Sequence, residues 1–228
     1  MSPFKWSYVF YYLPRLIPFI PVTLKVWILA IISGLLIGII FAVIRIKQIP
    51  VLTQIVRGIM SIVRGIPPIT QIFLFYYGVP MVLSIFGIDC SDMNGMWFVV
   101  FAYGISQAAA VSENIRASFQ SVGKGQLEAA YSVGMTGLTA YARIMIPQAL
   151  VVALPTFSNL CIATLKGTSL AFSVGVVEIM TRASQLAVNE MHIMESYVSL
   201  AIIYYGIYLI LKFFFDGIEK KISFENAG

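Results

Sequence analysis

The sequence predicts an all-α protein that crosses a lipid bilayer five times. The chain has 228 residues, of which 59% are hydrophobic and only 11% are charged, which is too apolar for an ordinary soluble domain. Uncharged runs of about 20 residues recur along it, and each is long enough to cross a hydrocarbon core of about 30 Å. The runs do not alternate between apolar and polar residues, so they favour helices over barrel strands.

Each expected span lies between charged residues, and the last one needs a special argument. The uncharged run 196–211 is short, and we expect Phe213–Phe215 to complete it because Lys212 can extend its ammonium group toward the headgroups. No linker, low-complexity run or internal repeat divides the chain, so a single domain is expected over residues 1–228. The predicted spans are 22–44, 66–88, 96–118, 144–176 and 196–216.

The basic residues are distributed unequally between the two sides of the membrane. Five spans place the two termini on opposite sides. The positive-inside rule then places the N-terminus outside and the C-terminus in the cytoplasm. The same loop bias accounts for the net charge of +5, so no nucleic-acid partner is expected. The cytoplasmic set is Arg45, Lys47, Arg57, Arg64, Arg116, Lys124, Arg143, Lys212, Lys220 and Lys221, and the outer set is Lys5, Arg15, Lys25 and Arg182.

Two local patterns refine the first half of the chain. Gly34 and Gly38 form a GxxxG motif, which favours close packing of the first span against another helix. Residues 45–64 show apolar positions at helical spacing with Arg57 and Arg64 between them, which indicates a short amphipathic helix near the inner surface. Arg64 is expected on the headgroups or in a substrate role, and the sequence favours neither.

The segment 124–143 interrupts the apolar chain with small and polar residues. Ala129 and Ala130 favour a helix with little bulk, so another protein surface can come close. Gly134 permits a turn between two short helices, and Pro147 suits the first turn of the next helix. A plain interfacial helix–turn–helix without a partner is the alternative.

The spacing of this segment leads to a known family. Glu128-Ala129-Ala130 is followed after three residues by Gly134 and then by Ile144 and Pro147, with Ile146 in place of a usual Leu. The pattern resembles the EAA loop of permease subunits of bacterial ATP-binding-cassette (ABC) importers. The resemblance implies a type I importer permease fold in which this loop is the cytoplasmic coupling helix.

Three more segments resemble the polar-amino-acid branch of these permeases, which includes histidine-, glutamine- and cystine-type members. Val63–Gln71 resembles the entry to their second span, where Pro67 and Pro68 disrupt helical hydrogen bonding. Glu113 and Arg116 match an E-x-x-R pattern before the EAA loop, and the segment from Asn159 to Leu170 resembles a motif with a lysine at membrane depth. The resemblance implies a substrate pathway lined by Lys166, Thr168, Ser169 and Asn159, with Gln107 of the third span as a further cavity residue.

Alternatives remain open for the charged members of these segments. Lys166 is expected either to face the pathway or to pair internally, with Glu113 or Glu178 as the partner. Glu113 and Arg116 lie three apart on a helix and are expected to form a structural ion pair. The single histidine, His192, is expected to be a solvated loop residue.

The resemblance implies that the chain works in a complex in the cytoplasmic membrane of a bacterium. The expected partners are two ATPase subunits, a second permease that is identical or homologous, an extracytoplasmic solute-binding protein and the lipid bilayer. The expected substrate is a polar amino acid, and the run Thr168–Met180 looks most like cystine-type members. An ATP-independent channel or ion-coupled carrier is the alternative.

No enzyme activity is expected of this chain alone. It has no P-loop for ATP, no HExxH or CxxC motif, and no Ser/His/Asp set that its single histidine could serve. We therefore expect no catalytic residue, metal or cofactor here, with ATP and Mg²⁺ bound by the partner ATPase subunits.

Overall fold

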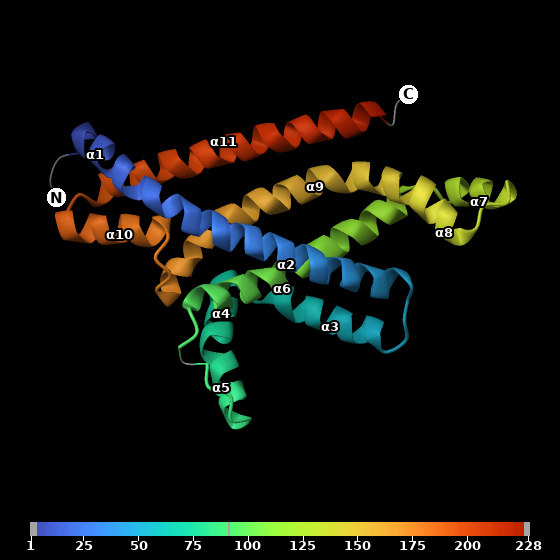
Figure 1. The fold of residues 1–228 in the computed structure, drawn as a ribbon, viewed down its shortest axis with the longest axis horizontal. Coiled ribbons are helices and arrows are strands. Elements are labelled where there is room, and N and C mark those ends of the chain that lie inside the picture. Colours follow the sequence, from blue (N-terminus) through green and yellow to red (C-terminus); the bar gives the residue numbers. More distant parts are fainter. Residues whose placement is uncertain (1–3, 91, 226–228) are drawn as a thin grey trace.

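The computed structural model describes residues 4–90 and 92–225, which form helices and no strands. The long helices run side by side along the longest dimension of the molecule, with residues 6–16 near one end and residues 124–140 at the other (Figure 1). Five helical stretches of the described chain are long and apolar enough to cross a membrane. The all-α class and the number of spans are confirmed.

The first three spans involve α1 (Trp6–Leu16), η1 (Ile17–Phe19), α2 (Ile20–Ile46), α3 (Leu52–Gly65), α4 (Pro68–Phe73), η2 (Leu74–Gly78), α5 (Val79–Ile85) and α6 (Gly95–Ser121). The remaining elements are α7 (Lys124–Ser132), α8 (Gly137–Ala140), η3 (Tyr141–Met145), α9 (Ile146–Gly167), η4 (Thr168–Val174), α10 (Ile179–Glu190) and α11 (Ile193–Glu225).

Helices α2 and α6 form the closest contact in the molecule. A Cβ atom added to Gly34 would lie 2.5 Å from the Cβ of Gln107, and one added to Gly38 would lie 2.8 Å from the Cβ of Val111. Such distances leave no room for a side chain, so both glycines allow the two backbones to approach. The prediction that this GxxxG motif packs helices is confirmed.

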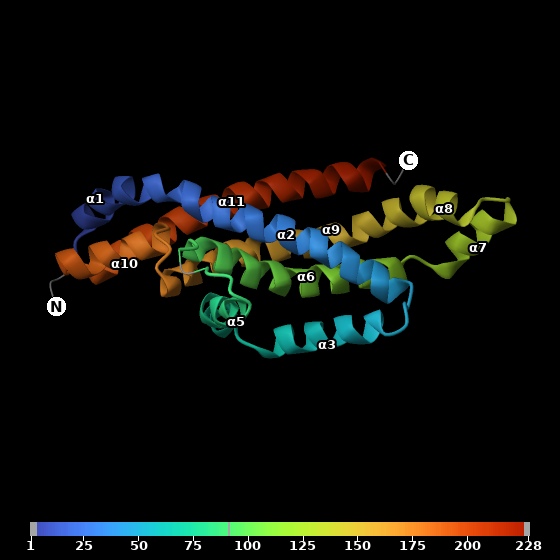
Figure 2. The same cartoon turned by 60° about the horizontal axis from the view of Figure 1, so that its bottom comes forward.

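The helical chain is broken at the entry to the second span. Helix α3 precedes this break and runs back along α2 and α6 (Figure 2), with Val56 and Met60 buried against Ala109 of α6. The amphipathic helix expected over residues 45–64 is present as α3, and its apolar stripe packs against protein. The predicted disruption at Pro67 and Pro68 is present, because α3 ends at Gly65 and α4 begins at Pro68.

Two π-helical turns precede prolines inside later spans. Leu74–Gly78 comes before Pro80, and Tyr141–Met145 comes before Pro147. A proline donates no backbone hydrogen bond and crowds the preceding turn, and a wider turn relieves that crowding without ending the helix. The fourth span therefore continues from Gly137 to Val174, with Pro147 in the first turn of α9 as expected.

The end of the molecule near the N-terminus is closed by α1, α10 and the start of α11. His192 stacks on Tyr8 with ring centroids 3.6 Å apart, and its Nδ1 lies 3.2 Å from Glu195 Oε1. The same carboxylate oxygen accepts a hydrogen bond from the Lys5 backbone N–H at 2.9 Å. His192 is 9% exposed, so the expectation of a solvated loop histidine is wrong. Its polar sequence neighbours did not reveal that α1 covers it.

Candidate functional site

One face of α6 is left uncovered along the bundle. Its members recur at helical spacing and are all partly or fully exposed: Ser106, Ala110, Glu113, Ala117 and Gln120. On one side of this stripe, Asn114 donates a hydrogen bond of 2.9 Å to the Ala153 carbonyl of α9. On the other side, Arg64 of α3 donates one of 3.0 Å to the Ala109 carbonyl. The stripe therefore lies between α3 and α9.

Both neighbouring helices also present polar stripes that the rest of the chain leaves exposed. On α9 the stripe is Gln148, Val152, Pro155, Thr156, Asn159, Ala163 and Lys166, and on α3 it is Gln54, Arg57, Ser61 and Arg64. We call the three stripes together the open face. Polar side chains at membrane depth are stable only against water or another protein, so a lipid surface is a poor fit for this face.

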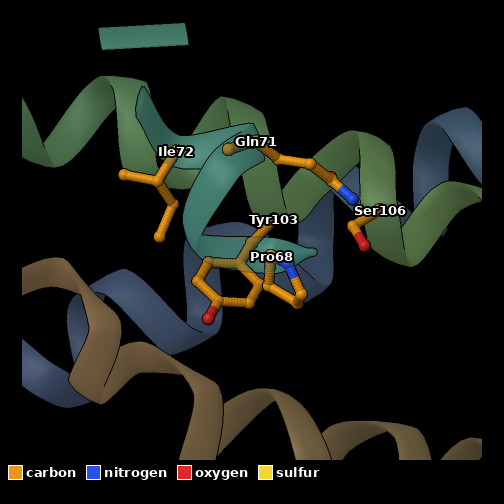
Figure 3. Close-up of a pocket in the computed structure, with 6 residues that line it drawn as sticks. Pro68, Gln71, Ile72, Tyr103 and Ser106 are labelled. Atoms are coloured by element: carbon orange, nitrogen blue, oxygen red, sulfur yellow. The ribbon is translucent and has the colours of Figure 1, made fainter. Parts of the chain in front are cut away.

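A small pocket lies at one end of the α6 stripe, under the start of α4 (Figure 3). Its polar lining is Gln71, Tyr103 and Ser106, with Pro68 between α4 and α6. The Gln71 amide donates to the carbonyls of Val63 and Ile66, at 2.7 and 2.8 Å. These carbonyls lose their helical partners at the proline break, so Gln71 caps the end of α3 from within α4.

Tyr103 joins this pocket to the end of α9. Its hydroxyl donates to the Gly167 carbonyl, and a Cβ on Gly167 would lie 2.8 Å from that hydroxyl. Gly167 is therefore required for the close approach of α6 and α9. Helix α9 ends at this residue, and the 3-10 helix η4 continues the chain.

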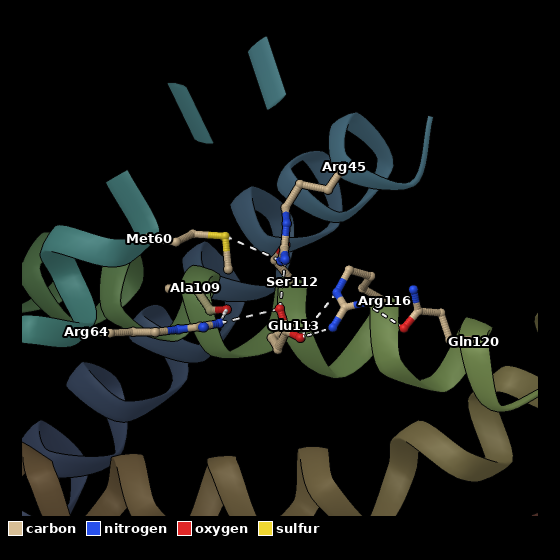
Figure 4. A network of polar contacts seen from close by, with 8 residues as sticks. All are labelled: Arg45, Met60, Arg64, Ala109, Ser112, Glu113, Arg116 and Gln120. Atoms are coloured by element: carbon tan, nitrogen blue, oxygen red, sulfur yellow. Dashed lines mark hydrogen bonds and ion pairs between the residues drawn. The ribbon is translucent and has the colours of Figure 1, made fainter. Parts of the chain in front are cut away.

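Glu113 is the centre of an ion-pair cluster in the open face (Figure 4). Its Oε2 lies 2.8 Å from Arg45 Nη2 of α2 and 3.8 Å from Arg64 Nη2 of α3, and its Oε1 contacts Arg116 one turn along α6. Arg45 also contacts Ser112 at 3.4 Å. The cluster links α2, α3 and α6 and contains three guanidinium groups for one carboxylate.

Lys166 lies on the open face without an acidic partner among the described residues. Its ammonium group sits 5.3 Å from the centre of the Tyr208 ring of α11. Neither internal partner considered from the sequence contacts it, because Glu113 binds arginines and Glu178 binds the hydroxyls of Thr23 and Tyr204.

The other expected pathway residues are divided between the open face and the interior. Asn159 is exposed about two turns before Lys166, on the same side of α9. Ser169 is half-buried and donates to the Lys166 carbonyl at 2.9 Å. Thr168 is fully buried and donates to the Leu165 carbonyl at 2.7 Å. Gln107 packs in the α2–α6 contact, with its Oε1 buried and without a hydrogen-bond partner in the described chain.

The segment 124–143 forms two short helices joined by a glycine turn. Gly134 has φ of 81°, a left-handed value that a residue with a side chain adopts only with strain. Glu128 and Ala129 are exposed on α7, whereas Ala130 is buried. The apolar side chains of Val133 and Leu138, beside the turn, are 74% and 84% exposed.

The inner side of α7 packs on two spans at once. Leu127 contacts a cluster formed by Val122, at the end of α6, and by Met145 and Ala149, at the start of the fourth span. A force applied to α7 would therefore reach α6 and α9 together. Both of these helices contribute stripes to the open face.

The roles of three residues that hold this site together were not predictable from the sequence. Arg45 contacts Glu113, which is distant in the sequence. Gln71 binds carbonyl groups that have no helical partner at the proline break. Nothing in the sequence distinguishes Tyr103 from a core aromatic residue. The only available signals were an arginine at the end of an apolar span and a glutamine closing the proline segment, and neither indicates its partner.

Five apolar spans, one of them broken, with a polar face left open along the bundle, define a multi-pass membrane transport protein. Residues 34–224 match the family model described as "Binding-protein-dependent transport system inner membrane component". The chain belongs to this family of membrane transport subunits.

Known relatives cover almost the whole chain. The "L-cystine transport system permease protein TcyL" of Bacillus subtilis is 41% identical over 212 residues, which are 93% of this chain and 89% of that protein. The "Probable amino-acid permease protein YxeN" of the same organism is 36% identical over 98% of both chains. A solved structure described as "an amino acid ABC transporter with histidines" matches with a TM-score of 0.85 at 29% identity, over 97% of this chain and 100% of the solved chain.

Proposed function

We propose that this chain is the permease subunit of an ATP-driven importer that carries a polar amino acid across the cytoplasmic membrane of a bacterium. L-cystine is the first candidate substrate, because a cystine permease is 41% identical to the chain. The chain itself has no nucleotide motif, so hydrolysis of ATP with Mg²⁺ takes place in a separate ATPase subunit. The N-terminus lies outside and the C-terminus inside, following the distribution of basic residues.

One observation carries this proposal: the exposed α7–α8 segment is packed directly onto the helices of the open face. Val133 and Leu138 leave apolar surface uncovered beside the Gly134 turn, which suits docking to another protein. Leu127 transmits any displacement of α7 to Val122 and Met145. An ATPase bound at this segment would thus move α6 and α9 when it closes around ATP.

The partners follow from the faces that the chain leaves uncovered. A second permease subunit, identical or homologous, covers the open face and encloses a path between the two polar surfaces. Each permease binds one ATPase, giving two per complex, through its α7–α8 segment. A solute-binding protein delivers the amino acid at the end that holds α1 and α10.

An ATP-independent channel or carrier would leave the α7–α8 segment without a role. The two functions are separated by purifying the complex, reconstituting it in liposomes and measuring ATP hydrolysis with a panel of amino acids and the binding protein. We expect hydrolysis and uptake to rise together with one polar amino acid. Uptake that proceeds without ATP would refute the importer function.

The coupling role of the turn is tested by Gly134→Val. This substitution adds a β-branched side chain at a φ of 81°, at a cost of about 1–2 kcal/mol for the left-handed conformation, so the turn reorganises. We expect hydrolysis to become insensitive to substrate and uptake to fall at least about tenfold, the factor that corresponds to 1.4 kcal/mol. Gly125→Ala is the matched control, because that glycine lies inside α7 with no atom within 4 Å of an added Cβ. Equal uptake in the two variants would contradict the role of the turn.

A further inference from the structure

We propose that Arg64 is the carboxylate-binding residue of the transport path. In this inference its guanidinium group binds a carboxylate of the amino acid as the substrate passes the break in the second span. The inference rests on the proposed function and adds to it the chemical group that is recognised and the residue that recognises it.

The cluster around Glu113 has a surplus of positive charge. Arg45, Arg64 and Arg116 supply three positive charges and Glu113 supplies one negative charge, which leaves a net charge of +2. Arg45 occupies Oε2 at 2.8 Å, and Arg116 occupies Oε1. Arg64 Nη2 remains 3.8 Å from Oε2, which is beyond hydrogen-bond distance. Arg64 is therefore the cation that Glu113 does not satisfy.

A backbone contact with α6 holds Arg64 in place. Nη2 donates to the Ala109 carbonyl at 3.0 Å, so one corner of the guanidinium group is fixed to α6. In the part of the chain that the structure describes, Nε and Nη1 make no hydrogen bond, and the side chain is 49% exposed, compared with 12% for Arg45. An anchored guanidinium with a free edge is suited to bind a carboxylate through two parallel hydrogen bonds.

The guanidinium group of Arg64 lies level with the middle of α6. It contacts Ala109, near the middle of this helix of 27 residues, and α3 ends one residue after Arg64. In a bilayer centred on α6, a charge at this level is costly unless water or a counter-charge reaches it. The nearest lipid phosphate would then be about 15 Å away, half the thickness of the hydrocarbon core. A solute anion in a water-filled path is therefore the better partner.

The neighbouring side chains complete a polar site. Ser61 lies one turn before Arg64 on the exposed side of α3, and Ser106 lies one turn before Ala109 on the open face of α6. Both hydroxyls can donate to a carboxylate or accept from an ammonium group. The exposed residues of the three stripes include Glu113 as their only carboxylate, and its oxygens are already paired with arginine, so the site disfavours a solute with net positive charge.

The test compares a substrate that has carboxylates with an analogue that lacks them. Binding of L-cystine and of L-cystine dimethyl ester is measured on the purified permease–ATPase complex in nanodiscs, without the solute-binding protein. We expect the wild type to bind the free acid at least about tenfold more tightly than the ester, and Arg64→Gln to bind both equally, because a charge-assisted bidentate pair is lost. An unchanged preference in Arg64→Gln would overturn the inference.

Two further variants separate direct contact from general attraction and from misfolding. Arg57→Gln removes the same charge seven residues away on the same exposed side of α3, and we expect it to reduce the preference by less than half as much. Arg64→Lys keeps the charge without the planar fork and is expected to weaken free-acid binding about threefold to tenfold. Unchanged free-acid binding in Arg64→Lys, or equal losses in Arg57→Gln and Arg64→Gln, would overturn the direct contact.

Two controls identify other causes of the same result. Binding is measured in nanodiscs with only uncharged lipids and in nanodiscs that contain phosphatidylglycerol. If Arg64→Gln reduces the preference for the free acid only with the anionic lipid, Arg64 binds a lipid phosphate and the inference is overturned. If wild-type proteoliposomes take up no amino acid, the proposed function fails, and this inference fails with it. If the wild type transports and the variants keep their preference, only the inference fails.

Discussion

The contact between α2 and α6 makes a strong prediction for Gly34→Ala. The added Cβ would lie 2.5 Å from Gln107 Cβ and 3.2 Å from the Gly104 carbonyl oxygen. Unbonded carbons prefer separations of about 3.5–4.0 Å, so the two helices must separate by about 1 Å at this crossing. Overpacking of this kind costs about 1–3 kcal/mol, and exchanging glycine for alanine in a helix returns about 0.5–1 kcal/mol.

We therefore expect a net destabilisation of about 1–2 kcal/mol in Gly34→Ala. For a chain of this size, that change lowers Tm by about 2–8 °C. The measurement is thermal unfolding of the purified complex, followed by tryptophan fluorescence. Gly206→Ala in α11 is the matched control, since no atom lies within 4 Å of its added Cβ, and its Tm should stay equal or rise. A Tm for Gly34→Ala at or above that of the control would refute the packing argument.

Two other substitutions test contacts at the break and at the end of the molecule that holds α1 and α10. Gln71→Ala leaves the Val63 and Ile66 carbonyls without their donor and should cost about 1–3 kcal/mol, read as a lower Tm, whereas an unchanged Tm would exclude the cap. Burial raises the pKa of Glu178 above its ordinary value, so the stability that it contributes is present at low pH and declines as pH rises through the raised pKa. Glu178→Gln should flatten this decline in Tm as the pH rises above about 4, the ordinary pKa of a glutamate, and equal slopes in both proteins would contradict it.

The sequence was most informative where one physical quantity decides the structure. Apolar length alone determines whether a helix can cross a bilayer, so five spans could be counted before any contact was known. A turn at Gly134 was predictable because glycine adopts backbone conformations that other residues resist, and Gly134 has a left-handed φ. The close approach at Gly34 was also readable, because small residues at a spacing of four have few other uses within a span.

Contacts between distant segments were not predictable in this way. An amphipathic pattern shows that α3 has a buried side, but not whether lipid headgroups, a neighbouring helix or a water-filled path meets its polar side. The pairing of Glu113 with Arg116 was predictable because they lie one turn apart, whereas Arg45 joins the cluster only because α2 crosses α6 at that level. Lys166 over Tyr208 depends in the same way on how α11 packs.

The positions of these contacts determine which parts can move separately. Gly34 and Gly38 hold α2 tightly against α6, and Arg45 joins the same pair through a contact of 2.8 Å with Glu113. Helix α3 is attached more weakly, because Arg64 lies 3.8 Å from that carboxylate and is half exposed. A displacement that enters α6 through Leu127 and Val122 would carry α2 with it and change the Arg64 contacts first. Motion driven at the α7–α8 segment would therefore act first on Arg64, because α3 is held against α6 more weakly than α2 is.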